Sequence, residues 1–272
     1  MHGIHPLIYI EMMSDLKKKK YLPGSEPIFL EGNNLGFLFV HGFTGGPYEG
    51  AEIARRLHKE FNCTVSVPLL PGHGTQPSDL KSVSWPQWIE TVRIAYFQLK
   101  ATCNKVVVCG LSMGGALALH LAAHQPVDAV ISLAGAAFIK DWRLKLLPLA
   151  RHIVPYQYKS KGPDIRDQSA KQKIVSYHKY PVKSVDQLLA LLQHVRGDLP
   201  EVSVPALLIH SKKDRTIHVS NLDYIAANIR SKIKKMLILE NSYHIVTVDV
   251  EKTQVFEAIT QFIREFVINK SE

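Results

Sequence analysis

Short runs of apolar residues recur along the chain, separated by stretches with helical periodicity. Each run is continuous rather than alternating, as expected of parallel strands that are covered on both faces. Six such runs predict strands at residues 35–40, 63–70, 105–110, 129–135, 205–211 and 234–240. Between them we expect helices at about residues 47–60, 85–101, 113–124, 218–230 and 252–268. Strand and helix therefore alternate, which predicts an α/β protein with a mostly parallel, doubly wound sheet.

One long segment breaks this alternation. From about Phe138 to Pro200 no strand is evident, and the sequence contains helical pieces rich in Leu, Arg and Lys. About sixty residues are too many for a plain loop, so we expect this insertion to form a helical cap over one end of the sheet. The expected organisation is a core of residues 25–137 and 201–272, a cap of residues 138–200, and a flexible N-terminal extension of residues 1–24.

The cap segment carries an apolar stripe at helical spacing. Its members are Val185, Leu188, Leu189, Leu192 and Val195. Such a stripe usually seals one element against another, and we expect it to hold the cap on the body. A stripe that also lines a substrate pocket is the alternative.

One serine lies between two glycines at a predicted strand-to-helix turn. The sequence GLSMGG, residues 110–115, follows the apolar run KVVVC and precedes a helix rich in Ala and Leu. A Gly-x-Ser-x-Gly turn in this position is typical of a nucleophile elbow, in which the small residues prevent collisions between neighbouring backbones. We interpret Ser112 as a nucleophile. An idle serine in a glycine-rich turn is the alternative, and the presence of catalytic partners decides between them.

Two residues later in the chain are candidates for those partners. A serine hydroxyl is a poor nucleophile near neutral pH, so it needs a base, and the base needs an orienting acid. In this type of site the chain order is serine, acid, histidine. Asp214 and His244 fit that order, and each follows the carboxyl end of a predicted strand, where open α/β sheets place site residues. Of the competing acids, Asp198 lies at the end of the expected cap and Asp249 lies beyond the histidine.

A third requirement is a pair of donors for the oxyanion of the tetrahedral intermediate. Losing one such donor typically costs about 3 kcal/mol in the barrier. One expected donor is the backbone N–H of Met113, directly after the candidate nucleophile, and the other is that of Phe43 in the loop HGFTGGP, residues 41–47. His41 in this loop is a possible base by residue type, but we interpret it as a brace for the loop.

Taken together, these motifs resemble the α/β-hydrolase family, and within it the bacterial monoacylglycerol lipases and carboxylesterases. The matching pieces are HGFTGGP, PGHGTQP (71–77), GLSMGG, PALLIHSKKD and NSYHIVTVD, in order over about residues 35–268. The resemblance implies the same catalytic residues, Ser112, Asp214 and His244, with Phe43 and Met113 as oxyanion donors. It also implies a helical cap that shapes an acyl pocket. The first twenty-odd residues extend beyond the usual start of the family, with Met12 and Met13 as alternative initiators.

The expected reaction is hydrolysis of monoacylglycerols or other short to medium acyl esters through an acyl-enzyme on Ser112. A thioesterase, an amidase or an acyltransferase could use the same residues, because the triad fixes the type of reaction and not the leaving group. A non-catalytic binding protein on this fold is the alternative outside enzymes, and its expected signature is a broken triad. All three triad residues are present.

Composition and charge narrow the choice of partners. The chain has 272 residues, of which 46% are hydrophobic and 21% charged, as in an ordinary globular protein. The formal net charge of +9 affects solubility and the attraction of anions, and it does not indicate the fold. The run Lys17–Lys20 is interpreted as a solvated tail, so no nucleic-acid partner is expected. The sequence leaves transient contact with a lipid surface and the oligomeric state open.

The cysteines and the N-terminus indicate the compartment. Cys63, Cys103 and Cys109 are few, and two of them lie in or beside apolar runs, which favours buried free thiols. The N-terminal PLIYI is interrupted by Glu11 and followed by lysines, the reverse of a signal peptide. No stretch approaches the roughly 18 apolar residues of a membrane span. We expect a cytoplasmic protein.

Thirteen histidines raise the question of a metal site. His120 and His124 lie four residues apart on a predicted helix, but no carboxylate ligand motif lies near them in the sequence. No metal and no other cofactor is expected.

Overall fold

The central sheet has seven strands in the order β1-β3-β2-β4-β5-β8-β9. The computed structural model describes residues 21–159 and 162–269, so most of the expected N-terminal extension, with Lys17–Lys20, lies outside the described residues. All neighbouring strands are parallel except β1, which runs antiparallel to β3. The strand bounds are β1 Ile28–Leu30, β2 Asn33–Val40, β3 Cys63–Val67, β4 Lys105–Leu111, β5 Ala129–Leu133, β8 Ala206–Ser211 and β9 Lys234–Leu239. The predicted α/β architecture is confirmed.

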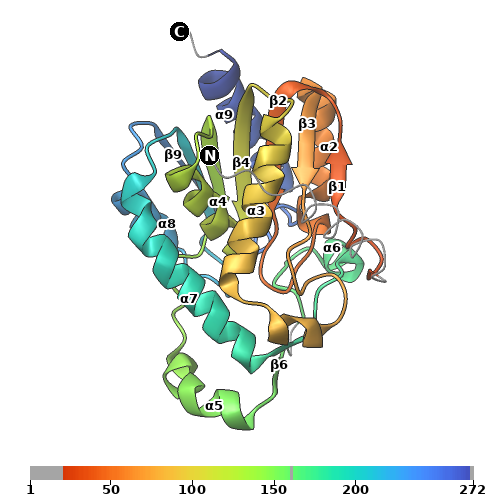
Figure 1. The fold of residues 1–272 in the computed structure, drawn as a ribbon, viewed down its shortest axis with the longest axis vertical. Helices are drawn as coiled ribbons and strands as arrows, with labels where there is room; N and C mark the ends of the chain where they lie inside the picture. Colours follow the sequence, from red (N-terminus) through yellow and green to blue (C-terminus); the bar gives the residue numbers. More distant parts are fainter. Residues whose placement is uncertain (1–20, 160–161, 270–272) are drawn as a thin grey trace.

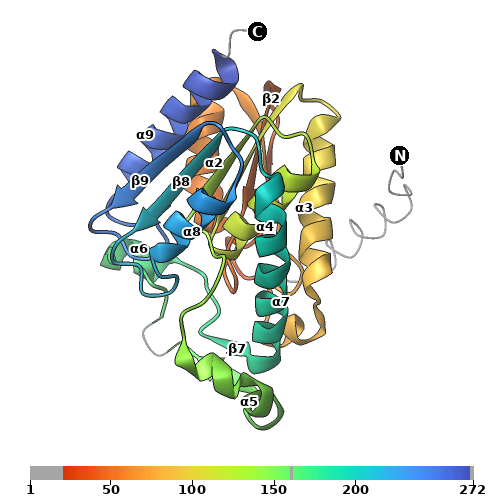
Figure 2. The same cartoon turned by 90° about the vertical axis from the view of Figure 1, so that its left-hand side faces the viewer.

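Helices cover both faces of this sheet (Figures 1 and 2). One face is covered by α2 and α9, and the other by α3, α4, α7 and α8. Their bounds are α2 Tyr48–Phe61, α3 Trp85–Lys100, α4 Met113–His124, α7 Val182–Asp198, α8 Ser220–Asn228 and α9 Lys252–Ile263. The α-helix predicted over 252–268 ends at Ile263 and continues as a π-helix, Arg264–Ile268. Short 3-10 helices lie at Pro77–Ser82, Trp142–Leu146 and Leu199–Glu201.

The central strand β4 shows why its sequence has no polar residue after Lys105. Successive side chains of a strand point to opposite faces. Val106 and Val108 belong to the hydrophobic cluster that includes α3, α4 and α7, whereas Val107 and Cys109 belong to the cluster that includes α2 and α9. Both faces of the strand are therefore buried, and no position tolerates a polar side chain without a partner.

The outer strands differ from the sequence-based expectation. The strand predicted over 63–70 ends at Val67, because Pro68 has no N–H to donate to the ladder. Strand β9 lies at the edge, and its first residues, Lys234 to Met236, are exposed rather than covered on both faces. The two lysines discourage pairing with a further strand. The short strand β1 has too few residues for its pattern to be recognised.

The inserted segment 138–200 contains two strands that the sequence did not predict. Strands β6 (Tyr156–Tyr158) and β7 (Lys179–Pro181) form a small antiparallel sheet in which Gln157 pairs with Tyr180. The expectation that no strand occurs here was wrong, because three-residue strands leave no measurable periodicity. The helices of this segment are α5 (Leu147–Ile153), α6 (Gln168–Lys173) and α7.

The apolar stripe on α7 seals this helix to the body. Leu188, Leu192 and Val195 are buried in the same cluster as Leu117 of α4. Helix α5, by contrast, lies at the far lower end of the molecule in Figures 1 and 2, beyond the sheet. The insertion thus combines one helix that belongs to the core with an outlying element.

The burial of the thiols agrees with the sequence analysis. Cys63, Cys103 and Cys109 are all buried and unpaired. Among residues 21–159 and 162–269, no helix combines the length and the apolar character that a membrane crossing needs.

Two glycines give a matched test of the packing at the β4–α4 turn. A Cβ on Gly110 would lie 2.0 Å from the carbonyl oxygen of Gly114, whereas a Cβ on the exposed Gly197 of α7 would meet nothing within 4 Å. We expect Gly110→Ala to lower the free energy of unfolding by at least about 2 kcal/mol. We expect Gly197→Ala to raise it by about 0.5–1 kcal/mol through helix propensity. Urea denaturation measures both, and equal stability of the two variants would contradict the close approach.

Candidate active site

Ser112 sits in a strained turn at the carboxyl end of β4. Its φ of 58° and ψ of −116° lie in a region that side chains rarely adopt. The turn is held because the Ser112 N–H donates to the carbonyl of Leu133 on β5 at 2.8 Å. A Cβ on Gly114 would lie 2.0 Å from the carbonyl oxygen of Val40, so only glycine lets α4 start this close to β2. This geometry is that of a nucleophile elbow.

Asp214 and His244 form a buried pair on the loops after β8 and β9. Nδ1 of His244 lies 2.7 Å from Oδ2 of Asp214, whose side chain is fully buried. The other carboxylate oxygen accepts the N–H groups of Thr216 and Ile217, both at 2.8 Å. Nε2 of His210 lies 3.2 Å from Oδ2. The carboxylate is therefore held in one orientation, and it holds the imidazole of His244 with Nδ1 protonated.

The electrostatics of this pair favour an ionised acid and a basic imidazole. Burial alone would raise the pKa of Asp214, but the charge and hydrogen bond of His244 and the hydrogen bond of His210 outweigh it and lower that pKa. Burial alone would lower the pKa of His244, and the carboxylate of Asp214 outweighs it, so the pKa of His244 is raised. A base whose pKa lies above that of an ordinary histidine is suited to taking a proton from a hydroxyl.

The structure places the candidate serine at the same sheet edge as this pair. Among the described residues, no hydrogen bond joins Ser112 to His244. The carboxylate of Glu49 lies near both residues. Its negative charge contributes to the raised pKa of His244. Gly42 packs against both Glu49 and Ser112, because a Cβ added to it would lie 3.3 Å from Oε2 of Glu49 and 3.4 Å from Cβ of Ser112. Catalytic hydrogen bonds are often long in a protein without substrate, so this geometry is compatible with a triad.

The loop after β2 carries the candidate oxyanion donor Phe43. His41 braces it, because its Nε2 accepts the N–H of Leu70 at 3.0 Å and its Nδ1 lies 2.9 Å from the carbonyl of Gly42. Burial lowers the pKa of His41 to about 4, so this imidazole stays neutral. The brace interpretation is confirmed. Met113, the other candidate, is the first residue of α4, where a backbone N–H has no partner within the helix.

The sequence analysis did not identify Glu49, whose carboxylate also fixes the loop after β2. Its Oε2 accepts the Gly42 N–H at 2.7 Å, and a Cβ on Gly45 would lie 2.1 Å from its Oε1. Burial raises the pKa of Glu49, against the effect of the Gly42 hydrogen bond. The available signal was its position in the first turn of α2, directly after the glycine-rich loop. Carboxylates favour that position on a helix.

Two residues of the insertion also reach the site. Nζ of Lys159 donates to the hydroxyl of Thr44 in the loop after β2 and, at 3.1 Å, to that of Ser176. Burial lowers the pKa of Lys159 to about 8. The backbone carbonyl of Asp164 accepts the N–H of His244 at 3.1 Å, and its carboxylate pairs with Arg215 at 2.6 Å. Both contacts join segments far apart in sequence, so no local pattern predicts them.

The two competing acids have other partners. Asp249 accepts the backbone N–H groups of Arg166, Asp167 and Tyr243 at 2.6 to 3.1 Å, so it ties the insertion to the loop before His244. Asp198 on α7 lies against histidines of α4 instead of the candidate serine. Of the three candidate acids, Asp214 is the one that pairs with His244.

The contact at Asp198 corrects one premise of the sequence analysis. His120 and His124 do have a carboxylate beside them, because Oδ2 of Asp198 lies 2.7 Å from Nδ1 of His120 and Oδ1 lies 3.1 Å from Nε2 of His124. The carboxylate comes from a helix 78 residues away, so spacing along the chain could not reveal it.

Comparison with known proteins places the chain in a family. The family model described as serine aminopeptidase, S33, matches residues 37–251. The chain belongs to this α/β-hydrolase family. The resemblance drawn from the sequence motifs is thereby confirmed.

Several relatives of this α/β-hydrolase are similar over nearly their whole length. It is 33% identical to a thermostable monoacylglycerol lipase of Bacillus sp. (strain H-257), over 89% of this chain and 95% of the relative. It is 24% identical to a carboxylesterase of Bacillus subtilis (strain 168), over 88% and 96%. A solved structure described under LipS and LipT, two metagenome-derived lipolytic enzymes, has a TM-score of 0.86 at 31% identity and covers 90% of this chain and 100% of its own.

The Asp214–His244 pair predicts a titration that can be observed directly. We expect His244 to titrate above the ordinary histidine value near 6.5 and His41 to titrate near 4. In Asp214→Asn the negative charge is lost, so the pKa of His244 should fall while that of His41 stays unchanged. Imidazole NMR signals followed over pH measure both values. An unchanged pKa of His244 in the variant would show that Asp214 does not govern it.

Proposed function

We propose that this protein hydrolyses monoacylglycerols and other short to medium acyl esters through an acyl-enzyme on Ser112. Hydrolysis of carboxylic esters is the activity after which the curated relatives are named. The observation that carries the finer assignment is the pairing of His244 with the buried carboxylate of Asp214 at the same sheet edge as the strained turn of Ser112. A buried imidazole with a raised pKa at the same sheet edge as a strained serine turn suits proton transfer from a hydroxyl.

In the proposed first half-reaction, Nε2 of His244 takes the proton of Ser112 while Oγ attacks the ester carbonyl. Asp214 holds Nδ1 and stabilises the imidazolium that forms. The imidazolium then gives its proton to the leaving alcohol, and the acyl group stays on Oγ. In the second half, water gives its proton to His244 as it attacks the acyl-enzyme, and the carboxylic acid leaves with Ser112 restored.

The proposed oxyanion hole consists of the N–H groups of Phe43 and Met113. Two contacts fix the loop that carries Phe43. The Glu49 carboxylate accepts the N–H of Gly42, and Nε2 of His41 accepts the N–H of Leu70. A donor that is already in place costs no reorganisation when charge develops on the carbonyl oxygen. This is the reason for assigning the loop a catalytic role rather than a purely structural one.

The alternatives use the same residues on another leaving group. The family description names an aminopeptidase, which cleaves amides, whereas the two curated relatives compared above are named for esters. Thioesters and acyl transfer are disfavoured by the same comparison. A non-catalytic role is disfavoured because the acid and the base are paired at 2.7 Å.

Substitution of the serine tests the proposal. We expect Ser112→Ala to lower the rate of monoacylglycerol hydrolysis at least about 10³-fold, because the nucleophile is removed while the oxyanion donors remain. The measurement is turnover of 1-monoacylglycerols and p-nitrophenyl esters of rising chain length, beside a thioester and an anilide of matched acyl group. The exposed Ser82→Ala is the matched control. Equal activity of both variants would exclude Ser112, and faster cleavage of the anilide would favour an amidase.

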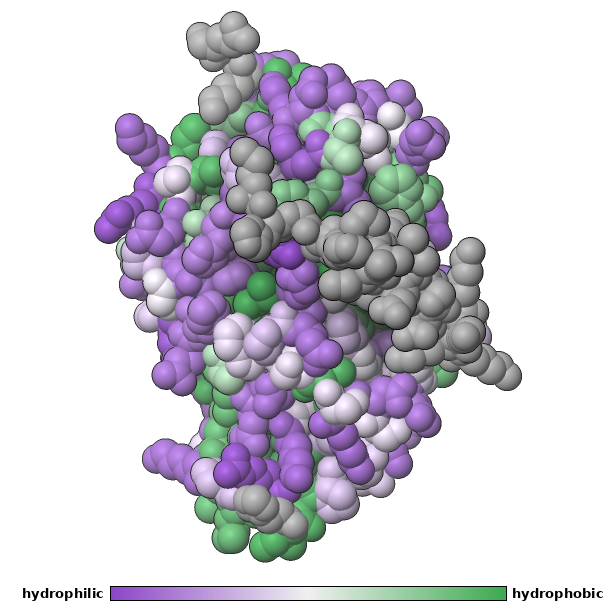
Figure 3. Space-filling view, viewed as in Figure 1, coloured by the Kyte–Doolittle hydropathy of each residue, from purple (hydrophilic) through white to green (hydrophobic). Residues whose placement is uncertain are grey.

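We further propose that the outlying part of the cap touches lipid surfaces transiently. Trp142 and Ile153 are 71% and 70% exposed, and Leu146 and Leu149 are also exposed. Figure 3 shows a hydrophobic area at the lower end of the molecule, where α5 lies in Figure 1. Arg143, Lys145 and Arg151 accompany these apolar side chains in the sequence. Apolar and basic side chains together suit an anionic lipid surface.

Vesicle binding tests this contact. Burying Leu149 and Ile153 in a lipid surface should contribute about 1.5 kcal/mol each, so Leu149→Ser with Ile153→Ser should weaken binding to anionic vesicles at least about tenfold. Co-sedimentation measures the binding, and turnover of a water-soluble short ester should stay unchanged. Met236→Ser is the matched control, because Met236 is an apolar side chain on β9 that is 47% exposed. Equal sedimentation of all three proteins would refute the contact.

For the location we propose the cytoplasm. Support comes from the three cysteines, which are all buried and unpaired. Free thiols suit a reducing compartment.

A further inference from the structure

Two pairs of polar side chains face one another across the contact between α4 and α7. His120 and His124 lie one helical turn apart on α4, and His194 and Asp198 lie one turn apart on α7. Residues four apart share one face of a helix, and these two helices pack directly together. Three imidazoles and one carboxylate therefore meet at the rim of an otherwise apolar interface. Ligand sites between helices are commonly built in this way.

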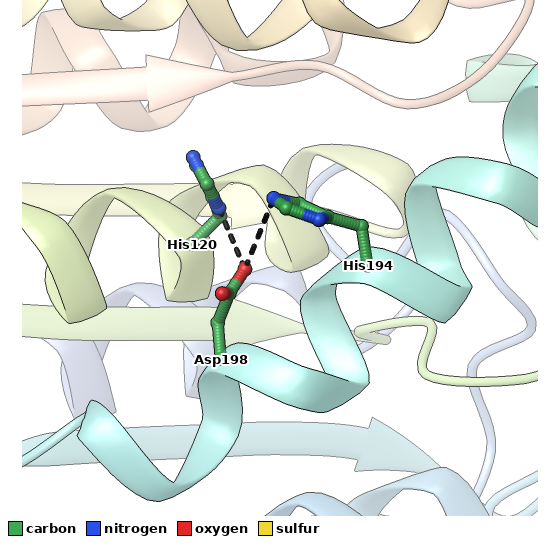
Figure 4. Close-up of side chains that lie close together, drawn as sticks. All are labelled: His120, His194 and Asp198. Atoms are coloured by element: carbon green, nitrogen blue, oxygen red, sulfur yellow. Dashed lines mark hydrogen bonds and ion pairs between the residues drawn. The ribbon is translucent and has the colours of Figure 1, made fainter.

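The carboxylate of Asp198 is the centre of this cluster. Figure 4 shows His120 and His194 converging on it from the two helices. Its Oδ2 lies 2.7 Å from Nδ1 of His120 and 3.7 Å from Nε2 of His194. One ligand atom from each of these three residues lies within 4.8 Å of the others. His124 holds the second carboxylate oxygen from the outside, with Nε2 at 3.1 Å.

We propose that His120, His194 and Asp198 bind one divalent transition-metal ion, for which Zn²⁺ is the probe. Zinc ligands at about 2.0–2.2 Å in tetrahedral geometry lie roughly 3.3–3.5 Å from one another. The two distances from the carboxylate fall on either side of that spacing, so small rotations of the side chains bring the three atoms around an ion. His124 then orients the carboxylate from the outer side, as partners of metal ligands typically do.

The charge and exposure of the cluster suit a cation of this class. Two imidazoles and a carboxylate form a donor set that suits zinc and similar ions rather than calcium or magnesium. The side chain of His194 is 43% exposed while that of Asp198 is 13% exposed, so an ion from solution can reach a preformed carboxylate.

Such an ion would join the last helix of the insertion to the helix that begins directly after Ser112. The cross-link lies between α4 and α7 and involves none of Ser112, Asp214 and His244. The inference therefore stands apart from the proposed esterase activity. Binding to the folded state alone stabilises the fold in proportion to the logarithm of the ion concentration.

Zinc titration of the full chain without an affinity tag tests the site. We expect isothermal titration calorimetry to give one ion per chain, and Zn²⁺ at about 100 times its dissociation constant to raise Tm by roughly 5 °C. His194→Gln and Asp198→Asn should each weaken binding at least about tenfold and remove the shift in Tm. Since His194 is half exposed, its replacement removes a ligand without opening a buried cavity.

His178→Gln is the matched control, because His178 is an exposed histidine of the same insertion. It should bind zinc as the wild type does. Absence of stoichiometric binding in the wild type overturns the proposal. Unchanged binding by both His194→Gln and Asp198→Asn places the ion elsewhere and overturns it as well. Far-UV circular dichroism without metal establishes that each variant is folded before titration.

Discussion

The turn from β4 to α4 is the constraint on which the rest of this structure depends. Ser112 has positive φ, a conformation that costs of order 1–3 kcal/mol and persists only where the surroundings impose it. Here β4 lies in the middle of the sheet between β2 and β5, and α4 packs back on it through glycines. A Cβ at Gly110 or at Gly114 would lie 2.0 Å from a backbone oxygen. The turn and the packing of α4 on the sheet therefore exclude any residue other than glycine at these two positions.

Carboxylate side chains anchor the loops at the carboxyl edge of the sheet. Glu49 accepts a backbone N–H of the loop after β2, and Asp214 accepts two N–H groups of its own loop. In the loop after β9, Asp249 accepts the N–H of Tyr243 and Glu251 accepts that of Ser242. Hydrogen bonds to charged groups are stronger than neutral ones, so loops that carry no regular structure are still fixed. Candidate catalytic side chains on such loops need little ordering when substrate binds.

The sequence predicted those parts of the molecule in which local pattern and tertiary structure agree. Strand β4 and helix α4 match their predicted ranges almost residue for residue, because a continuous apolar run and an Ala/Leu-rich run lead to the same elements that the core requires. The pairing of Asp214 with His244 was predictable for the same reason, because each residue follows a recognisable strand. Candidate site residues at strand ends can therefore be identified from the local sequence.

Contacts between distant segments were beyond the reach of that reasoning. Asp164 supports the His244 loop from 80 positions upstream, and Asp198 meets His120 from 78 positions downstream. Strands β6 and β7 have three residues each and pair across more than twenty residues of chain. Nothing in the spacing of such residues distinguishes them from surface positions. The sequence analysis expected no metal site at His120 because it could not detect the contact with Asp198.

These contacts also determine which part of the insertion can move. Displacing α7 from the body would expose Leu188, Leu191, Leu192 and Val195, at about 1.5–3 kcal/mol for each side chain, which together approaches the stability of a whole domain. The segment Trp142–Ile153 buries much less, since Trp142, Leu146, Leu149 and Ile153 are already exposed and Leu147 is its one buried large apolar side chain. Displacing the 3-10 helix Trp142–Leu146 and helix α5 therefore costs less free energy than displacing α7, whose buried side chains pack in the same hydrophobic cluster as α4. The helix that follows Ser112 is thus supported by the part of this segment that is hardest to displace.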